Sequence, residues 1–286
     1  MQISVVIPHL NQPEALARCL ASLAAGARQP DEIIVVDNGS GAMPRVPAGV
    51  TLLTETTPGP GPARNLGVAH ASGDVLAFID ADCLADTDWL AAAEAAIVPQ
   101  DILGGDVRIA YAEAANLTAL EAYESIYAYR MDRYIAREGF TGTGNLVVKA
   151  AVLDTVGGFA GLDVAEDREW GQRATGQGFK IAYVAGMKVY HPARKTFAEL
   201  RAKWDRHMAH DYGVTGKPKW VVKTLAMGLS PLAELPRIIM SDRLSGFLPK
   251  LKAFKVLVQI RSYRAWRMAE LLLTGDPDRL SGKWNR

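Results

Sequence analysis

Several features that would assign this sequence to a common class of protein are scarce or missing. Only two of its 286 residues are cysteines, Cys19 and Cys83, and they are too few for a disulfide framework and form no Cys-x-x-Cys pair. We therefore expect a reducing, cytoplasmic setting. Residues 2–7 follow the first methionine without a basic stretch or a cleavage site, so they indicate a core strand and not a signal peptide.

Long apolar runs are also lacking. Residues 221–240 come nearest to the roughly 18 apolar residues of a spanning helix. They contain Lys223, Glu234 and Arg237, and they are interrupted by two prolines. We expect that the chain does not cross a membrane.

Two signatures of nucleotide-binding proteins are absent as well. The Gly-rich loop at residues 142–145 lacks the lysine of a phosphate-binding P-loop, and no Gly-x-Gly-x-x-Gly follows a predicted strand. A dinucleotide-dependent dehydrogenase is therefore disfavoured. A nucleotidyltransferase would need a Gly-rich basic loop after its first strand, where this chain has residues 9–13 (His-Leu-Asn-Gln-Pro).

The net charge of +1 conceals an uneven distribution. Residues 194–286 contain 19 Lys and Arg against 8 Asp and Glu, or +11, which leaves −10 for residues 1–193. Such asymmetry indicates an anionic partner for the C-terminal end. The tail lacks the aromatic and base-reading pattern of nucleic-acid modules, so an anionic membrane surface bound through residues 218–286 is favoured over nucleic acid. The alternatives are that the tail packs on the rest of the chain or forms a homodimer.

Strand and helix patterns alternate along the first part of the chain. We expect strands at residues 2–7, 32–37, 50–54, 75–79 and 102–109, separated by helices at 13–26, 64–70 and 89–98. This order predicts parallel pairing and an α/β sheet covered on both faces.

The second half is less regular. We expect one long helix at residues 115–138, short strands at 146–148, 180–184 and 187–190, and helices at 150–156 and 166–177. From Thr196 onward the chain becomes long, basic and helical, with an amphipathic apolar stripe within residues 247–272. We therefore divide it into a catalytic domain at 1–193, with halves at 1–109 and 110–193, and a basic helical region at 194–286.

The most informative stretch is the apolar run at residues 76–79, which is followed by Asp80 and Asp82. Ligands of open α/β sheets collect at the carboxyl ends of strands. Two neighbouring carboxylates are costly to ionise together unless a cation compensates them, and oxygen ligands suit Mg²⁺ or Mn²⁺. The alternative is that these residues only cap the helix near Trp89.

These motifs together resemble glycosyltransferase family 2, an inverting family with the GT-A fold. The resemblance covers about residues 1–193, and its pieces occur in the family's order. They are Pro8 and Asn11 after the first strand, residues 35–40 with Asp37, residues 61–67 with Arg64, Asp80 and Asp82, residues 144–145 and 157–159, Glu166 and Asp167 with Arg173 and Gly178, and His191. The implied fold is a Rossmann-like mixed α/β sheet with helices on both faces, to which this chain adds a C-terminal helical extension.

The resemblance implies a role for each matching residue. Pro8, Asn11, Asp37, Arg64 and Asp80 would contact the nucleotide-sugar donor. Asp82, with Asp80 and His191, would hold a divalent cation, Mn²⁺ or Mg²⁺. Asp167 would be the catalytic base, with Glu166 as the alternative. Arg173 is expected to pair with these two acids more than to contact the donor.

Two positions depart from the family pattern. Cys83 stands where the family commonly has an acidic residue, and Ala160 and Gly161 stand where it has an acidic pair. Both departures concern the acceptor more than the reaction.

We therefore expect a metal-dependent inverting glycosyltransferase that uses a nucleotide-diphosphate sugar, such as a UDP-sugar. Its acceptor would be the hydroxyl group of a lipid, a lipid-linked molecule or a saccharide, reached from the cytoplasmic face of the inner membrane. The rival hypotheses are a non-catalytic scaffold that binds nucleotide sugars and a nucleotidyltransferase. The acidic pair could also merely favour a helix N-terminus, and His191 could be a surface histidine.

Overall fold

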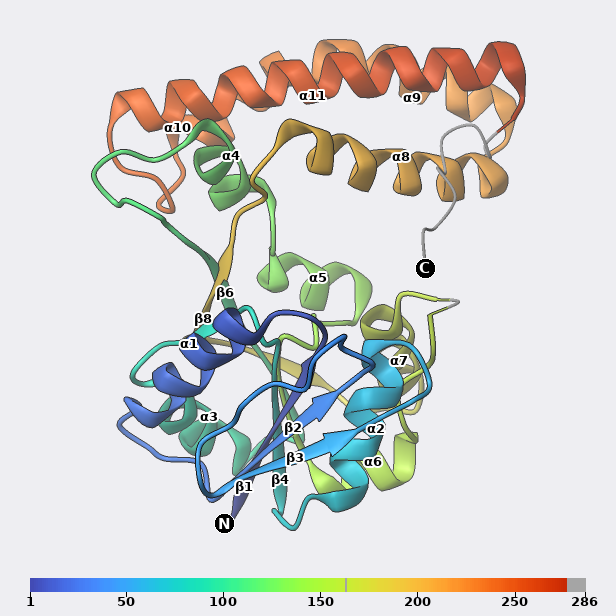
Figure 1. Cartoon of the computed structure of the whole chain (residues 1–286). Helices are drawn as coiled ribbons and strands as arrows, with labels where there is room; N and C mark the ends of the chain where they lie inside the picture. Colours follow the sequence, from blue (N-terminus) through green and yellow to red (C-terminus); the bar gives the residue numbers. More distant parts are fainter. Residues whose placement is uncertain (163, 277–286) are drawn as a thin grey trace. The chain divides into compact units, whose positions relative to one another are not determined.

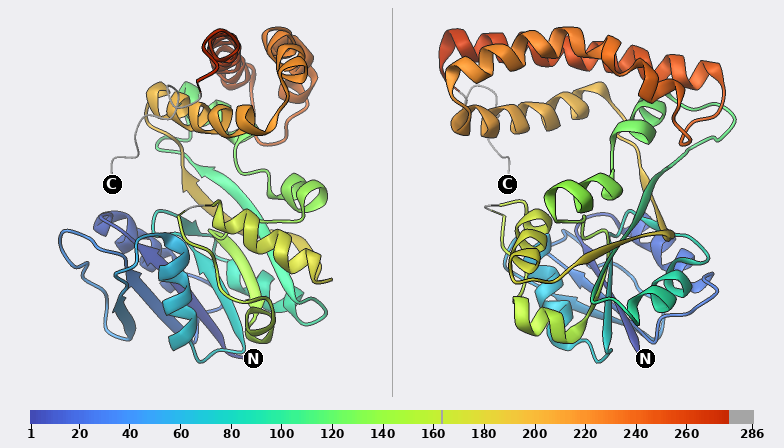
Figure 2. Two further views of the ribbon diagram at one scale, coloured as in Figure 1. Left: turned by 90° about the vertical axis from the view of Figure 1, so that its right-hand side faces the viewer. Right: turned by 180° about the vertical axis from the view of Figure 1, so that it is seen from behind.

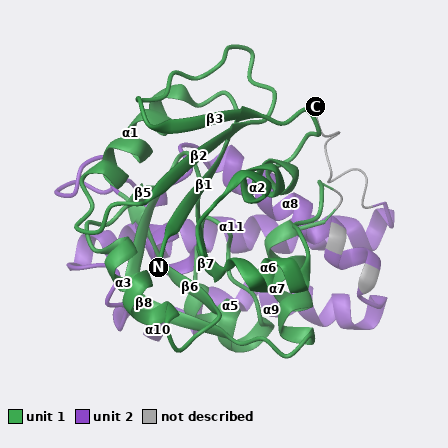
Figure 3. Ribbon diagram, turned by 90° about the horizontal axis from the view of Figure 1, so that it is seen from below, with its two compact units in different colours: residues 1–110, 129–192 green, residues 111–128, 193–286 purple. Residues whose placement is uncertain are grey.

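The computed structural model of the chain describes residues 1–162 and 164–276. It divides into two compact units, coloured separately in Figure 3. Unit 1 contains residues 1–110 and 129–192, and unit 2 contains residues 111–128 and 193–286. Residues 111–128, which the sequence placed in the acceptor half of the catalytic domain, thus belong with the C-terminal helices. Residues 277–286 of the predicted membrane-binding segment lie outside the described part.

Unit 1 is built on one eight-stranded sheet with the order β3-β2-β1-β4-β7-β6-β8-β5. The strands are β1 (Ile3–His9), β2 (Glu32–Asp37), β3 (Val50–Thr54), β4 (Val75–Ile79), β5 (Leu84–Ala85), β6 (Ile102–Ala110), β7 (Asn145–Lys149) and β8 (Ile181–Pro192). Strands β1 to β4 pair in parallel as predicted, but β7 lies antiparallel between β4 and β6. The sheet is therefore mixed.

Helices cover both faces of this sheet (Figure 1). One face packs against α1 (Pro13–Ala24) and α3 (Trp89–Ile97), which contribute Leu16, Leu20, Trp89 and Ile97 to the core. The other packs against α2 (Pro60–His70), α6 (Ala150–Val156) and α7 (Glu166–Gly176). Neighbouring residues of β1 alternate between the two cores, as the pleat of a strand requires.

Three local predictions are wrong for identifiable reasons. Pro8 does not end the first strand, because β4 pairs with β1 only as far as Val6 and no hydrogen bond on that side is lost. The helix predicted at residues 115–138 is two helices, α4 (Ala119–Tyr127) and α5 (Met131–Glu138), separated where Tyr129 adopts a φ of +49°. Residues 180–184 and 187–190 form the single strand β8, which pairs with β6 through a register shift.

Unit 2 consists of α4 and four C-terminal helices. These are α8 (Phe197–Val214), α9 (Lys217–Ala233), α10 (Leu235–Ile239) and α11 (Phe247–Thr274). The long α11 lies alongside α9 (Figure 2) and buries Ala253, Leu257 and Ile260 in a core shared with α4. Within the described residues, no helix combines the length and the apolar character needed to cross a membrane.

Candidate active site

Arg64 joins two acidic segments that lie far apart in the sequence. Its Nη2 donates to Asp80 Oδ1 at 2.6 Å, and its Nη1 donates to Glu166 Oε1 at 2.9 Å. The guanidinium is almost fully buried, with 2% of Arg64 exposed. These ion pairs join the end of β4 to the start of α7.

The position of α2 depends on a close approach to the sheet. A Cβ atom on Gly67 would lie 2.4 Å from Val6 Cγ1, so only glycine allows the helix to pack this tightly on β1. Pro60 begins the helix at a position where its missing N–H is not needed. Arg64, one turn further on, is thereby held over the strand end.

Asp167 lies beside this ion-pair network at the N-terminal turn of α7. Its carboxylate is half-buried and accepts a hydrogen bond from the backbone N–H of Arg168 at 2.7 Å. Burial, followed by the negative charge of Glu166, raises the pKa of Asp167 to about 6, while the charge of Arg64 opposes the increase. A carboxylate with this pKa is ionised at neutral pH and can accept a proton.

Asp82 lies against His191, which is contributed by the end of β8. The Asp82 Oδ2 atom is 3.6 Å from His191 Nε2, and the Tyr129 hydroxyl is 3.1 Å from His191 Nδ1. Ligand atoms of Asp82, His191 and Cys83 all lie within 4.8 Å of one another. Burial raises the pKa of Asp82, His191 opposes the increase and Asp80 adds to it.

This group has the chemistry of a divalent-cation site. A carboxylate and an imidazole suit Mn²⁺, and the carboxylate suits Mg²⁺. Cys83 is the least suitable member, because burial raises the pKa of its thiol well above the usual value and keeps it protonated. Asp80, which the sequence also predicted as a metal ligand, is bound by Arg64 through Oδ1 and is not one of these three residues, so its role as a ligand stays a prediction.

Asp37 is buried at the end of β2. It is 1% exposed, and its Oδ1 is 2.8 Å from His9 Nδ1 while its Oδ2 accepts from the Ser40 N–H at 3.0 Å. Burial disfavours the charged carboxylate, but the hydrogen bonds from Ser40 and His9 outweigh it and lower the pKa of Asp37. These hydrogen bonds hold the loop after β2, and the contact of Asp37 with the nucleotide stays a prediction.

Asn11 supports the same loop from the end of β1. It has a φ of 53°, its N–H donates to Ser40 Oγ at 2.8 Å, and its Oδ1 accepts from the Gly41 N–H at 2.9 Å. Asn11 is exposed and the neighbouring Pro8 is half-buried, so both remain open to the donor contact expected from the sequence.

Arg173 does not form the ion pair expected from the sequence. It binds Glu169, one helical turn away, with Nε to Oε1 at 2.8 Å and Nη2 to Oε2 at 2.9 Å. It also donates to the carbonyls of Val156 and Gly158. Arg173 thus anchors the loop after α6, and Arg64 is the ion-pair partner of Glu166.

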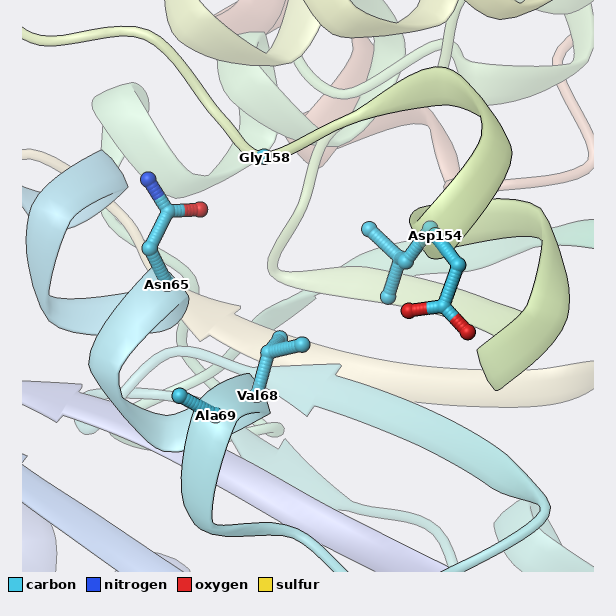
Figure 4. A pocket seen from close by; sticks show the side chains of 6 residues that line it. Asn65, Val68, Ala69, Asp154 and Gly158 are labelled. Atoms are coloured by element: carbon cyan, nitrogen blue, oxygen red, sulfur yellow. The ribbon is translucent and has the colours of Figure 1, made fainter.

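A separate hollow lies between α2 and α6 (Figure 4). Its lining residues are Asn65, Val68, Ala69, Leu153, Asp154 and Gly158. The Asn65 amide is already used by the backbone of Phe159, from which it accepts and to which it donates at 2.8 Å. The hollow contains none of the acidic site residues, so we assign it no part in the chemistry.

Sequence comparison identifies the relatives of this chain. A family model described as "Glycosyl transferase family 2" matches residues 4–164. Glycosyltransferase AglE of Haloferax volcanii is 32% identical over 215 residues, which cover 70% of this chain and 70% of that protein. The uncharacterized glycosyltransferase YwdF of Bacillus subtilis is 30% identical over 139 residues, covering 46% of this chain and 52% of the relative.

Solved structures show the same fold at low sequence identity. Mannosyltransferase PcManGT from Pyrobaculum calidifontis, in complex with GDP-Man and Mn²⁺, gives a TM-score of 0.56 at 16% identity, covering 96% of this chain and 88% of that one. S. aureus TarS 1–349 in complex with UDP-GlcNAc gives 0.54 at 17% identity, covering 98% and 77%. The GT-A fold expected from the sequence is confirmed.

Proposed function

The chain belongs to glycosyl transferase family 2, and we propose that it is a metal-dependent inverting enzyme that transfers a sugar from a nucleotide-diphosphate donor. The acceptor is the hydroxyl group of a lipid, a lipid-linked molecule or a saccharide. The observation that carries this proposal is the double ion pair of Arg64 with Asp80 and Glu166, because it sets Asp167 beside the strand end that bears Asp82. The nucleotide sugars bound by TarS and PcManGT support this donor class, with a UDP-sugar as our first candidate.

Asp167 is the proposed general base. It accepts the proton of the acceptor hydroxyl while that oxygen forms a bond to the anomeric carbon, and the bond from this carbon to the nucleoside diphosphate breaks on the opposite face. A single displacement of this kind inverts the anomeric configuration. Glu166 is less suited to the task, because its Oε1 is already occupied by Arg64.

Asp82 and His191 would hold the divalent cation, Mn²⁺ or Mg²⁺. When bound, such a cation supplies Lewis-acid stabilisation of the negative charge on the departing diphosphate. Asp80 is held rigidly by Arg64 beside this position, where its second oxygen is available to orient the donor ribose. Pro8 and Asn11 lie at the neighbouring strand end and complete the proposed donor site.

The site of action we propose is the cytoplasmic face of the inner membrane. The charge of +11 on residues 194–286 supports it, because a basic surface is attracted to anionic lipids. An acceptor carried by a lipid would be present at the same surface.

The test is a screen of nucleotide sugars with Mn²⁺ or Mg²⁺, in which the released nucleotide is measured. We expect turnover with at least one donor, its loss on chelation, and weaker metal-dependent donor binding in Asp82→Ala. Asp167→Asn should reduce turnover by about 10²- to 10⁴-fold while donor affinity is kept. Asp154→Asn makes the same substitution at an exposed residue of α6 and should change neither turnover nor donor affinity.

Two results would contradict the proposal. Unchanged turnover in Asp167→Asn would remove the assigned base. Donor binding without consumption of any donor, even when acceptors of all three classes are supplied, would favour the non-catalytic scaffold.

A further inference from the structure

Helix α9 presents a row of aliphatic side chains to solvent. Val222 is 66% exposed, Leu225 68%, Leu229 74% and Leu232 67%. Their spacing of three, four and three residues places them along one face of the helix. Isolated exposed leucines are ordinary on protein surfaces, but a continuous row of this kind marks an interaction surface. We call these four residues the α9 stripe.

The other side of α9 is fixed within unit 2. Trp220 is 1% exposed and donates its indole N–H to the carbonyl of Met268 in α11 at 3.1 Å. Trp220 and Met268 share a small core with Met208 and Leu271. The face of α9 that packs into unit 2 is therefore the one with Trp220, and the α9 stripe is not part of that core. It is a second apolar face.

The charges around the α9 stripe indicate what it contacts. Lys217, Lys219 and Lys223 lie in the first two turns, and residues 214–233 contain no acidic residue. The first acidic residue, Glu234, caps the far end of the helix. Exposed leucines with lysines as the charged residues of the helix are typical of helices that lie in the interface of anionic membranes. The 17-residue helix does not meet the length and hydropathy that a spanning helix needs.

We propose that α9 lies in the plane of an anionic membrane, with the α9 stripe in the acyl boundary and the three lysines at the lipid phosphates. This inference rests on the proposed function only for the location of the acceptor. It also replaces an expectation from the sequence, which placed the amphipathic stripe within residues 247–272. That stripe is partly used inside unit 2, where Met268 is 3% exposed and Phe254 is half-buried against the core.

The connection between α10 and α11 gives further apolar surface. Ile239 is 64% exposed, Met240 82%, Phe247 80% and Leu248 59%. These two pairs of large apolar side chains, one at each end of the connection, are suited to insertion into the same membrane interface. They provide a second set of variants that is independent of α9.

The experiment is vesicle flotation of the full chain, read by protein recovery and without any substrate. The wild type should float with vesicles containing phosphatidylglycerol and less with pure phosphatidylcholine. Leu225→Glu combined with Leu229→Glu should lower the partition coefficient by at least about a hundredfold, since each buried leucine contributes on the order of tenfold. Replacing the three lysines by glutamine should cost roughly fivefold each, with anionic vesicles only.

A matched control and a fold check complete the design. Val98→Glu puts the same charge on an apolar residue of unit 1 that is 71% exposed, and it should float as the wild type does. Because the replaced residues Leu225, Leu229 and Val98 are 68%, 74% and 71% exposed, the double leucine variant and the Val98→Glu control should both keep the wild-type melting temperature. Flotation needs no donor, so a negative flotation result would not contradict the proposed transfer reaction. Likewise, absence of transfer activity would not contradict membrane binding by α9.

Two results would overturn the inference. One is flotation of the double leucine variant at the wild-type level. The other is a wild type that sediments as a dimer and does not float while the variant is a monomer, which would make the α9 stripe a contact between two copies of the chain.

Discussion

Removing Arg64 and removing the charge of Glu166 should shift the pH profile of transfer in opposite directions. The positive charge of Arg64 lowers the pKa of Asp167, and the negative charge of Glu166 raises it. Arg64→Met therefore raises this pKa, and Glu166→Gln lowers it. If Asp167 is the base, the acidic limb of the kcat profile must follow the pKa in each variant.

The magnitude follows from the geometry of the site. The pKa of Asp167 is about 6, and the group is half-buried beside both charges. A charge within about 4 to 6 Å changes a carboxyl pKa by roughly 1 to 3 units, and partial solvation favours the lower end. We expect the limb near pH 7 in Arg64→Met and near pH 5 in Glu166→Gln, each about one unit from the wild type.

The assay is nucleotide release at saturating donor and acceptor between about pH 4.5 and 8, with stability checked at each pH. Arg45→Met makes the same substitution on an exposed loop and should leave the limb at about pH 6. Arg64→Met will also bind donor less well, which is why kcat and not kcat/KM is compared. Shifts of the same sign in both variants, or no shift in either, would refute the assignment of Asp167.

Two further substitutions test the same site through stability and packing. Asp167→Asn should raise the free energy of unfolding at pH 8 by up to roughly 3 kcal/mol and leave it unchanged near pH 4. The sign follows because the folded-state pKa of Asp167 is raised from 3.8 to about 6, so the folded protein loses stability as the pH rises through 6 and the carboxyl ionises. Urea unfolding at both pH values measures the free energy of unfolding. Gly144→Ala should cost about 1 to 3 kcal/mol and raise the donor KM, because the new Cβ would lie 2.6 Å from Asp80 Oδ2. Gly213→Ala, whose Cβ meets nothing within 4 Å, is its control in both the melting and the kinetic measurement, and an equal loss in the two variants would contradict the packing argument.

Most of the sheet could be predicted from the sequence, because the buried strands are uniformly apolar and end in turn residues. The break between α4 and α5 could not. Residues 115–138 have helical spacing throughout, and this spacing does not reveal the left-handed φ of Tyr129, whose ring lies beside His191 with centroids 4.6 Å apart. The strand β5 is too short, at two residues, to leave a pattern.

The site was predictable to the extent that strand ends define it. The sequence points to Asp80, Asp82 and Asp167 as candidates. It does not reveal the partner of Glu166, since Arg64 lies 102 residues away. The error at Arg173 was avoidable. Glu169 stands four residues before it on the same helix, and that spacing favours a local ion pair. Tyr129 and His9 gave no signal, because an isolated aromatic or histidine in a loop or strand is uninformative.

The distribution of charge within the site gives a reason for the two roles assigned to its carboxylates. Four acids converge there, and the single buried guanidinium of Arg64 compensates two of them, Asp80 and Glu166. Asp82 lies beside His191, and Asp167 accepts from the backbone N–H of Arg168. These are the two of the four acids whose pKa burial raises. An uncompensated buried carboxylate is stabilised by gaining a cation or a proton. In the proposed mechanism one group holds a cation and another accepts a proton. Asp82 and Asp167 would take these tasks, because Arg64 pairs with the other two acids, Asp80 and Glu166.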